Sequence, residues 1–131
     1  MPYDSPYEAL GEQGVRSLVD EFYRIMDTSQ DYKEIRAMHA EDLEPIKDKL
    51  GDYLIGWMGG PQLYLQKYGS VCMTNPHTGF YIGPRERDSW ISCMQEAMLS
   101  LEISNEIQTM LLGPLYRLAD AVKNRQVDKV Y

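Results

Sequence analysis

The fold class of this chain can be read from residues 43–58, LEPIKDKLGDYLIGWM. Apolar side chains recur there every three or four residues, at Leu43, Ile46, Leu50, Tyr53, Leu54, Trp57 and Met58. This spacing places them on one side of an α-helix, in a stripe wide enough to face a protein core. Asp42 is expected to cap the start of the helix, and Gly59-Gly60-Pro61 is expected to end it.

Further helices are predicted on the N-terminal side of this stretch. Ser5-Pro6-Tyr7-Glu8 is typical of a helix start, because it combines a capping serine, a proline at the first helical position and a glutamate three residues after the cap. Gly11 and Gly14 weaken that short helix, and residues 15–26 predict a second, amphipathic helix. Residues 32–38 are expected to form one or two helical turns.

Helices are also predicted in the C-terminal half of the chain. We expect a helical turn at 63–68, a loop over 69–83, a helix opened by Gly83-Pro84 and another capped by Ser104 or Asn105. No segment alternates apolar and polar residues with β-branched enrichment, and no internal repeat is present. The sequence therefore predicts an all-α fold.

Length and composition indicate one globular domain. With 131 residues, the chain is long enough for one hydrophobic core and too short for two ordinary domains. We expect the core to span about 6–122, followed by a polar C-terminal tail over 123–131. A net charge of −7 without a basic patch argues against nucleic-acid binding. The sequence shows no apolar run of about 20 residues and no signal-peptide pattern, so we expect a cytoplasmic protein that does not bind membranes.

Histidine is the scarce residue type with possible chemistry. Common nucleotide-binding and hydrolase motifs are absent from the sequence, and His39 and His77 are its only histidines. Cys72 and Cys93 could join them in a zinc site, but structural zinc ligands come in tighter local pairs. A lone histidine is most often a hydrogen-bonded or surface imidazole, and the remaining alternative is a haem iron bound by one histidine.

Five motifs favour the haem alternative, and their order and spacing resemble those of the group II truncated haemoglobins over about residues 6–122. They are Phe22-Tyr23, the run from Gly56 to Tyr64, Tyr68-Gly69, His77-x-x-Phe80-x-Ile82, and Glu86-Arg87-Asp88-Ser89-Trp90-Ile91-Ser92-Cys93-Met94. The resemblance implies a shortened globin fold, in which two antiparallel helix pairs cross around haem b. A departure is that this chain lacks the arginines that family members commonly carry just before the proximal histidine.

The resemblance also implies roles for individual residues. His77 matches the proximal iron ligand, while Tyr23, His39 and Trp90 match residues that stabilise the ligand on the distal side. An imidazole at His39 could donate a hydrogen bond when neutral, transfer a proton, or ligate iron itself. The implied haem contacts are Ile46, Lys49, Leu50, Tyr53, Tyr64, Lys67, Tyr68, Met73, Phe80, Trp90 and Met94. Among these, Lys49, Tyr64, Lys67 and Tyr68 resemble the residues that meet the haem propionates.

The function that follows from the resemblance is binding of dioxygen and other diatomic ligands at haem iron. Strong hydrogen-bond donors over the bound ligand favour its retention over its release. This favours redox chemistry with oxygen, peroxide or nitric oxide, supported by a reductase, over simple oxygen transport. Peroxidase-like or nitric oxide detoxifying activity stays open, as does oxygen transport. Two alternatives are a haem-free helical interaction module, with His77 and Trp90 merely structural, and a haem-based sensor.

Overall fold

The computed structural model describes residues 5–70, 72 and 77–128, and this part of the chain is helical with no strand. The all-α prediction is thereby confirmed. The helices are α1 (Pro6–Thr28), the 3-10 helix η1 (Gln30–Tyr32), α2 (Lys33–Ala37), α3 (Glu44–Trp57), α4 (Leu63–Tyr68), α6 (Pro84–Ser100) and α7 (Asn105–Val122).

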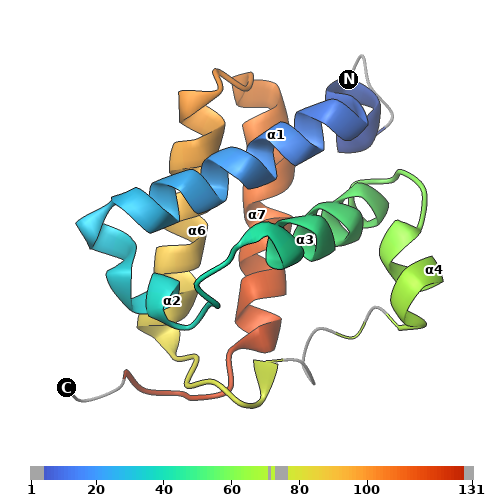
Figure 1. The fold of residues 1–131 in the computed structure, drawn as a ribbon. Helices are drawn as coiled ribbons and strands as arrows, with labels where there is room; N and C mark the ends of the chain where they lie inside the picture. The colour runs from blue at the N-terminus through green and yellow to red at the C-terminus, as the bar shows by residue number, and fades with distance from the viewer. Residues whose placement is uncertain (1–4, 71, 73–76, 129–131) are drawn as a thin grey trace.

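The long helices form two crossing pairs. Figure 1 shows α1 and α3 running in opposite directions in front of α6 and α7, which form a second antiparallel pair and cross behind them. The core lies at this crossing, where side chains of all four helices are almost completely buried. Burial of each such large apolar side chain contributes about 1.5–3 kcal/mol. Among them are Leu18, Phe22 and Met26 of α1, Leu54 and Ile55 of α3, Met94 and Met98 of α6, and Leu111 and Leu115 of α7.

Helix α1 begins and breaks where the sequence predicts. The Ser5 hydroxyl accepts a hydrogen bond from the Glu8 N–H, and Pro6 occupies the first helical position. Gly11 has φ +71° and ψ 174°, a conformation that favours glycine and interrupts the helix. The short N-terminal piece thereby turns toward the end of α3, where the Tyr7 N–H donates to the Met58 carbonyl at 3.1 Å.

Helix α3 ends where the sequence predicts, but its N-cap is Leu43, one residue after the expected Asp42. The Asp42 carboxylate accepts from the Glu44 N–H at 3.0 Å, and the helix ends before the Gly59-Gly60-Pro61 stop. Glycine is required at position 60 because a Cβ there would lie 2.8 Å from the ring of Tyr7. The two ends of α3 are therefore held by neighbours on both sides.

A buried carboxylate ties α3 to α1 and α4. Asp52 is 1% exposed, and its two oxygens accept from Arg16 Nη2 at 2.8 Å and Lys67 Nζ at 2.7 Å. Burial alone would raise the pKa of the Asp52 carboxyl, but the hydrogen bonds and charges of Arg16 and Lys67 hold that pKa below its ordinary value. Asp52 is therefore ionised at neutral pH and stabilised by two cations.

The residues after α7 do not extend freely from the domain. Asn124 and Arg125 donate their backbone N–H groups to the Ile82 carbonyl at 2.8 and 3.0 Å. Farther along, the Asp128 carboxylate accepts from the Arg85 N–H at 2.8 Å. The polar tail predicted over 123–131 is thus packed against the segment before α6 as far as it is described. No helix in the described part of the chain is long and apolar enough to cross a membrane.

Candidate functional site

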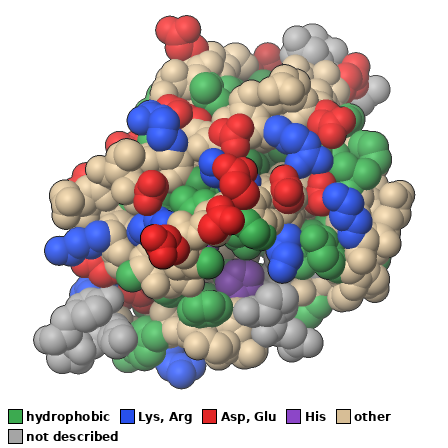
Figure 2. Space-filling view, in the orientation of Figure 1, with side chains coloured by type: hydrophobic (Ala, Val, Ile, Leu, Met, Phe, Trp, Pro, Cys, Tyr) green, Lys and Arg blue, Asp and Glu red, His purple; other side chains and the backbone are tan. Residues whose placement is uncertain are grey.

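A cavity of about 530 Å³ lies between the two helix pairs and the segment before α6. This volume falls within the range of about 300–1,000 Å³ that is usual for small-molecule and cofactor sites. Most of its wall is apolar, and both histidines of the chain line it. Figure 2 shows a histidine among hydrophobic side chains on the face turned toward the viewer. Apolar wall residues are Ile35, Met38, Ile46, Leu50, Ile82, Trp90, Leu118 and Val122.

His77 comes to this cavity from the segment between α4 and α6. Its backbone carbonyl accepts from the Phe80 N–H at 3.1 Å, which closes a turn directly after it. In the part of the chain that the structure describes, no three His, Cys, Asp or Glu side chains come together to hold a metal ion. The zinc set of Cys72, His77, His39 and Cys93 therefore has no support there.

Tyr23 reaches the cavity from α1. It is 3% exposed, and burial, followed by the neighbouring Cys93 thiol, raises the pKa of its phenol well above the ordinary value. The hydroxyl therefore stays protonated at neutral pH and can donate a hydrogen bond. Within residues 5–70, 72 and 77–128 it has no hydrogen-bond partner, although Tyr23 lines the cavity.

Trp90 reaches the same cavity from α6. Its indole packs edge-on against Phe22 with ring centroids 5.3 Å apart, and Phe22 in turn contacts Tyr23 at 4.9 Å. Trp90 is thus both a neighbour of the core and part of the cavity wall. Its N–H has no acceptor in the described residues, so the cavity is lined by two side chains whose donors are available to a ligand.

His39 follows α2, and its ring lies 5.6 Å from that of Tyr23. Its Nδ1 is 2.8 Å from the Ile35 carbonyl oxygen. A carbonyl only accepts, so Nδ1 carries the proton, and Nε2 of the neutral ring bears a lone pair. Burial lowers the pKa of the imidazole, and the charges of Arg36 and His77 lower it further. At neutral pH His39 therefore offers Nε2 as an acceptor, which differs from the expectation that the neutral ring donates into the pocket.

Most of the other predicted site residues also line the cavity. They are Ile46, Lys49, Leu50, Tyr53, Tyr64 and Phe80. Lys49 has no carboxylate at ion-pair distance in the described residues, whereas the cavity arginine, Arg87, is paired with Asp88 and Asp120 at 2.9 Å each. Lys49 is therefore the available cation of this cavity.

Four predicted contacts are not among the residues lining the cavity. Lys67 is directed to the buried Asp52, whose charge it neutralises, and Met94 is completely buried in the core. Tyr68 packs at a tilt against Tyr64, a cavity residue, with ring centroids 4.5 Å apart, and is itself half-exposed. Met73 lies outside the described residues.

Sequence reasoning missed part of the cavity wall. Leu118 and Val122 belong to the apolar stripe of α7, and Ile35 and Met38 to the turns before His39, but helical spacing cannot distinguish a core position from a cavity wall. Glu86, also on the wall, is used locally: its Oε1 accepts from the Gly83 N–H at 2.8 Å and caps α6.

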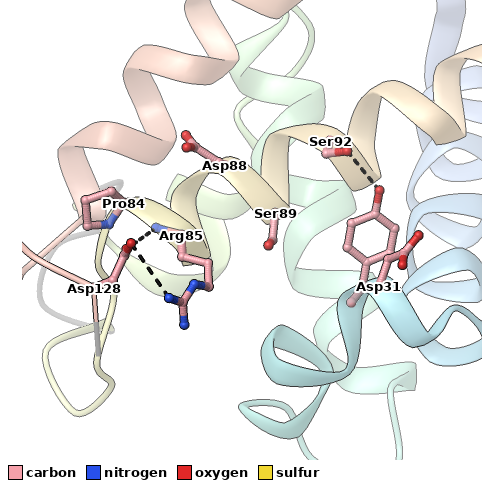
Figure 3. A pocket seen from close by; sticks show the side chains of 8 residues that line it. Asp31, Pro84, Arg85, Asp88, Ser89, Ser92 and Asp128 are labelled. Carbon is pink, nitrogen blue, oxygen red and sulfur yellow. Dashed lines mark hydrogen bonds and ion pairs between the residues drawn. The ribbon is translucent and has the colours of Figure 1, made fainter. Parts of the chain in front are cut away.

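A second hollow, of about 520 Å³, lies between η1 and the start of α6 (Figure 3). Its wall is polar, and several of its side chains already have partners. Arg85 pairs with Asp128 at 3.8 Å, and the Tyr32 hydroxyl lies 2.9 Å from Ser92 Oγ and also donates to Glu96. None of the predicted site residues lines this hollow.

Comparison with known proteins identifies the fold around the first cavity. The model of the bacterial-like globin family matches residues 5–124. The chain belongs to this family. Its resemblance to group II truncated haemoglobins is also confirmed. It is 31% identical to the group 2 truncated hemoglobin YjbI of Bacillus subtilis (strain 168) over 94% of this chain and 91% of that protein.

Solved structures agree with this globin assignment. The group II 2-on-2 hemoglobin of Agrobacterium tumefaciens superposes with a TM-score of 0.88 at 35% identity, covering 96% of this chain and 98% of that one. The truncated oxygen-avid haemoglobin of Bacillus subtilis superposes with a TM-score of 0.83 at 33% identity, covering 92% and 100%. Membership in this family implies haem-based binding of small diatomic ligands. The predicted crossing of two antiparallel helix pairs is confirmed as well.

Proposed function

We propose that this globin holds haem b in the 530 Å³ cavity, with His77 as the protein ligand of the iron, and retains dioxygen and related ligands for redox chemistry. The observation that carries the proposal is the pair of donors on the cavity wall. Tyr23 O–H and Trp90 N–H lack hydrogen-bond partners in the described residues, and both side chains line the cavity. A polar ligand in the cavity would satisfy both.

The chemistry of the wall fits a haem. Ile46, Leu50 and Phe80 offer apolar contact to a porphyrin face, and the ammonium of Lys49 and the hydroxyl of Tyr64 suit carboxylate side groups. His77 is assigned to the iron because it matches the proximal histidine of the group II truncated haemoglobins, whereas the ring of His39 lies beside that of Tyr23, which matches a distal-side residue of the same family. When bound, haem iron supplies a coordination position for a diatomic ligand and exchanges single electrons with it.

Tyr23 and Trp90 would act by holding the ligand. A hydrogen bond to a ligand that carries partial negative charge contributes about 1.5–3 kcal/mol, and about 1.4 kcal/mol corresponds to a factor of ten in rate. Two donors would slow dissociation by about two to four orders of magnitude. The similarity to a haemoglobin described as oxygen-avid supports this reading. Slow release favours redox use, with electrons from a separate reductase, over oxygen transport.

His39 would add a proton acceptor. Its Nε2 lone pair can accept a hydrogen bond from the Tyr23 hydroxyl or a proton from a protonated ligand such as peroxide. Because the pKa of His39 is lowered, this acceptor is available throughout the neutral pH range. Tyr23 remains a donor under the same conditions, so the two side chains have complementary roles.

The deciding experiment is a set of visible spectra of the purified protein in ferric, ferrous and oxygenated forms, with haem stoichiometry measured by extraction. We expect one haem b per chain and an oxygenated form that persists in the absence of reductant. A colourless protein that stays folded without haem would instead support the helical interaction module.

A further inference from the structure

One side chain after α7 holds the segment that carries His77. Asn124 Oδ1 accepts from the Ile82 N–H at 2.9 Å, and Asn124 Nδ2 donates to the carbonyls of His77 at 3.1 Å and Phe80 at 2.9 Å. Its backbone N–H donates to the Ile82 carbonyl at 2.8 Å. A carboxamide combines one acceptor oxygen and two N–H donors on a planar group, so it can bond both the N–H and the C=O groups of a backbone turn.

The residues on both sides of Asn124 are themselves held in place. The Lys123 N–H donates to the Asp120 carbonyl at the end of α7, which places Asn124 one residue beyond that helix turn. After it, the Arg125 guanidinium lies over the Tyr81 ring at 5.1 Å, and the Tyr81 hydroxyl donates to the Val127 carbonyl. The turn is therefore connected to a long helix of the core by contacts on both sides of Asn124.

The backbone of the His77 turn is bonded both within itself and to Asn124. Within it, the Phe80 N–H to His77 carbonyl bond closes the turn, and Asn124 satisfies the next groups along the chain. The direction of a side chain follows from the backbone that carries it, and ligand atoms must be held within about 0.5 Å to act well. Holding the His77 carbonyl therefore restricts where its imidazole can lie.

We propose that Asn124 is a positioning residue for His77. Because Asn124 is fixed at the end of α7 and bonded to the turn 77–82, it sets the position of the His77 imidazole relative to α7. This inference rests on the proposed role of His77 as the iron ligand. Asn124 itself does not line the cavity; it acts through the backbone of three residues that do, His77, Phe80 and Ile82.

The test compares Asn124→Ala and Asn124→Asp with a matched tail variant, Asp128→Ala. Asn124→Ala removes all three side-chain bonds. Asn124→Asp keeps the acceptor for the Ile82 N–H but sets a carboxylate against the carbonyls of His77 and Phe80. Asp128→Ala removes the contact with Arg85 and leaves the turn untouched.

Three measurements are made on each protein. Hydrogen exchange of the haem-free chain reports the protection of the Phe80 and Ile82 amides. Resonance Raman of the ferrous, ligand-free protein reports the iron–histidine stretching band, and transfer to an apo-globin acceptor reports haem release. We expect both Asn124 variants to lose amide protection, to shift or broaden the band, and to release haem about tenfold faster. Asp128→Ala should match the wild type in the band and in release.

The outcomes separate this inference from the haem assignment. If the Asn124 variants lose amide protection while the band and haem release stay unchanged, Asn124 only stabilises the tail and the inference is wrong. Unchanged amide protection also overturns it. If the wild type shows no iron–histidine band, or His77→Ala keeps it, the assignment of His77 fails, whatever the exchange data show. Asn124→Asp keeps the test decisive if Asn124→Ala does not fold.

Discussion

The two hollows of this globin differ in chemistry but hardly in size. They have volumes of about 530 and 520 Å³, yet the first is mostly apolar with two donors that have no partner in the described residues, and the second is polar with side chains that bind one another. In the second, Arg85 is paired with Asp128 and Tyr32 with Ser92 (Figure 3). Volume alone therefore does not identify a site; polar groups without partners in an apolar wall do.

The position of each hollow explains this difference. The first lies where two helix pairs cross, so its walls come from the buried faces of four helices. The second lies between η1 and the start of α6, where Arg85 is paired with Asp128 and Tyr32 with Ser92. The first two predictions below test whether ligand chemistry is confined to the first hollow.

The largest effect is expected from removing the iron ligand. His77→Ala should abolish stable haem binding, or leave a haem protein that recovers its spectrum only with added imidazole, because no second histidine is available in the right place. Haem content and the ferrous–carbon monoxide spectrum measure this. Ser89→Ala, in the second hollow, is the matched control and should behave as the wild type. An unchanged spectrum in His77→Ala would contradict the assignment.

Loss of a donor in the first hollow should have the next largest effect. Trp90→Phe and Tyr23→Phe should each raise the dissociation rate of dioxygen about tenfold to a hundredfold, as one charge-assisted hydrogen bond is lost. The rate increase in the double variant should be smaller than the product of the two single increases, because both donors bind one ligand. Tyr32→Phe removes a comparable hydroxyl from the second hollow and should leave the rate unchanged. Stopped-flow ligand replacement measures all four proteins.

A smaller effect is expected at the buried Asp52, which lines neither hollow. Asp52→Asn should lower the free energy of unfolding by about 1–2 kcal/mol at pH 7, a value reduced by the partial exposure of Arg16 and Lys67. The folded state lowers the pKa of Asp52, so its contribution is present above the ordinary pKa and is lost as the pH falls through the folded value.

Urea unfolding at pH 7 and at pH 3 tests whether the contribution of Asp52 to stability is lost as the pH falls. The stability difference between wild type and Asp52→Asn should shrink at the lower pH. A difference that is constant with pH would show that packing, and not charge, explains the role of Asp52.

The smallest effect is expected at His39. His39→Phe should slow peroxide-driven oxidation about tenfold and change dioxygen binding less, because it removes a proton acceptor from the cavity but no donor to the ligand. The pKa of His39 is lowered, so the wild-type oxidation rate should be constant near neutral pH. The rate should fall at acid pH, where Nε2 becomes protonated. Rates measured from pH 5 to 8 decide this; identical profiles in both proteins would leave His39 as a packing residue.

The sequence by itself determined the helices of this protein and their ends. Spacing of apolar residues, the Ser5 cap and the break at Gly11 are local properties, and the structure keeps each of them. The family could also be recognised, because the run from Glu86 to Met94 and its distance from His77 are linear features of the chain.

Only the tertiary structure decided how the polar side chains are paired. Lys67 pairs with Asp52, His39 donates a hydrogen bond from Nδ1 to a backbone carbonyl, and Asn124 is bonded to a turn more than forty residues earlier in the chain. Periodicity tells which side of a helix is buried, but it cannot tell whether that side meets another helix or a cavity. Met94 and Leu118 show both outcomes, since Met94 is buried in the core and Leu118 lines the cavity. Such partners depend on how the helices cross, which is set by the packing of the whole core.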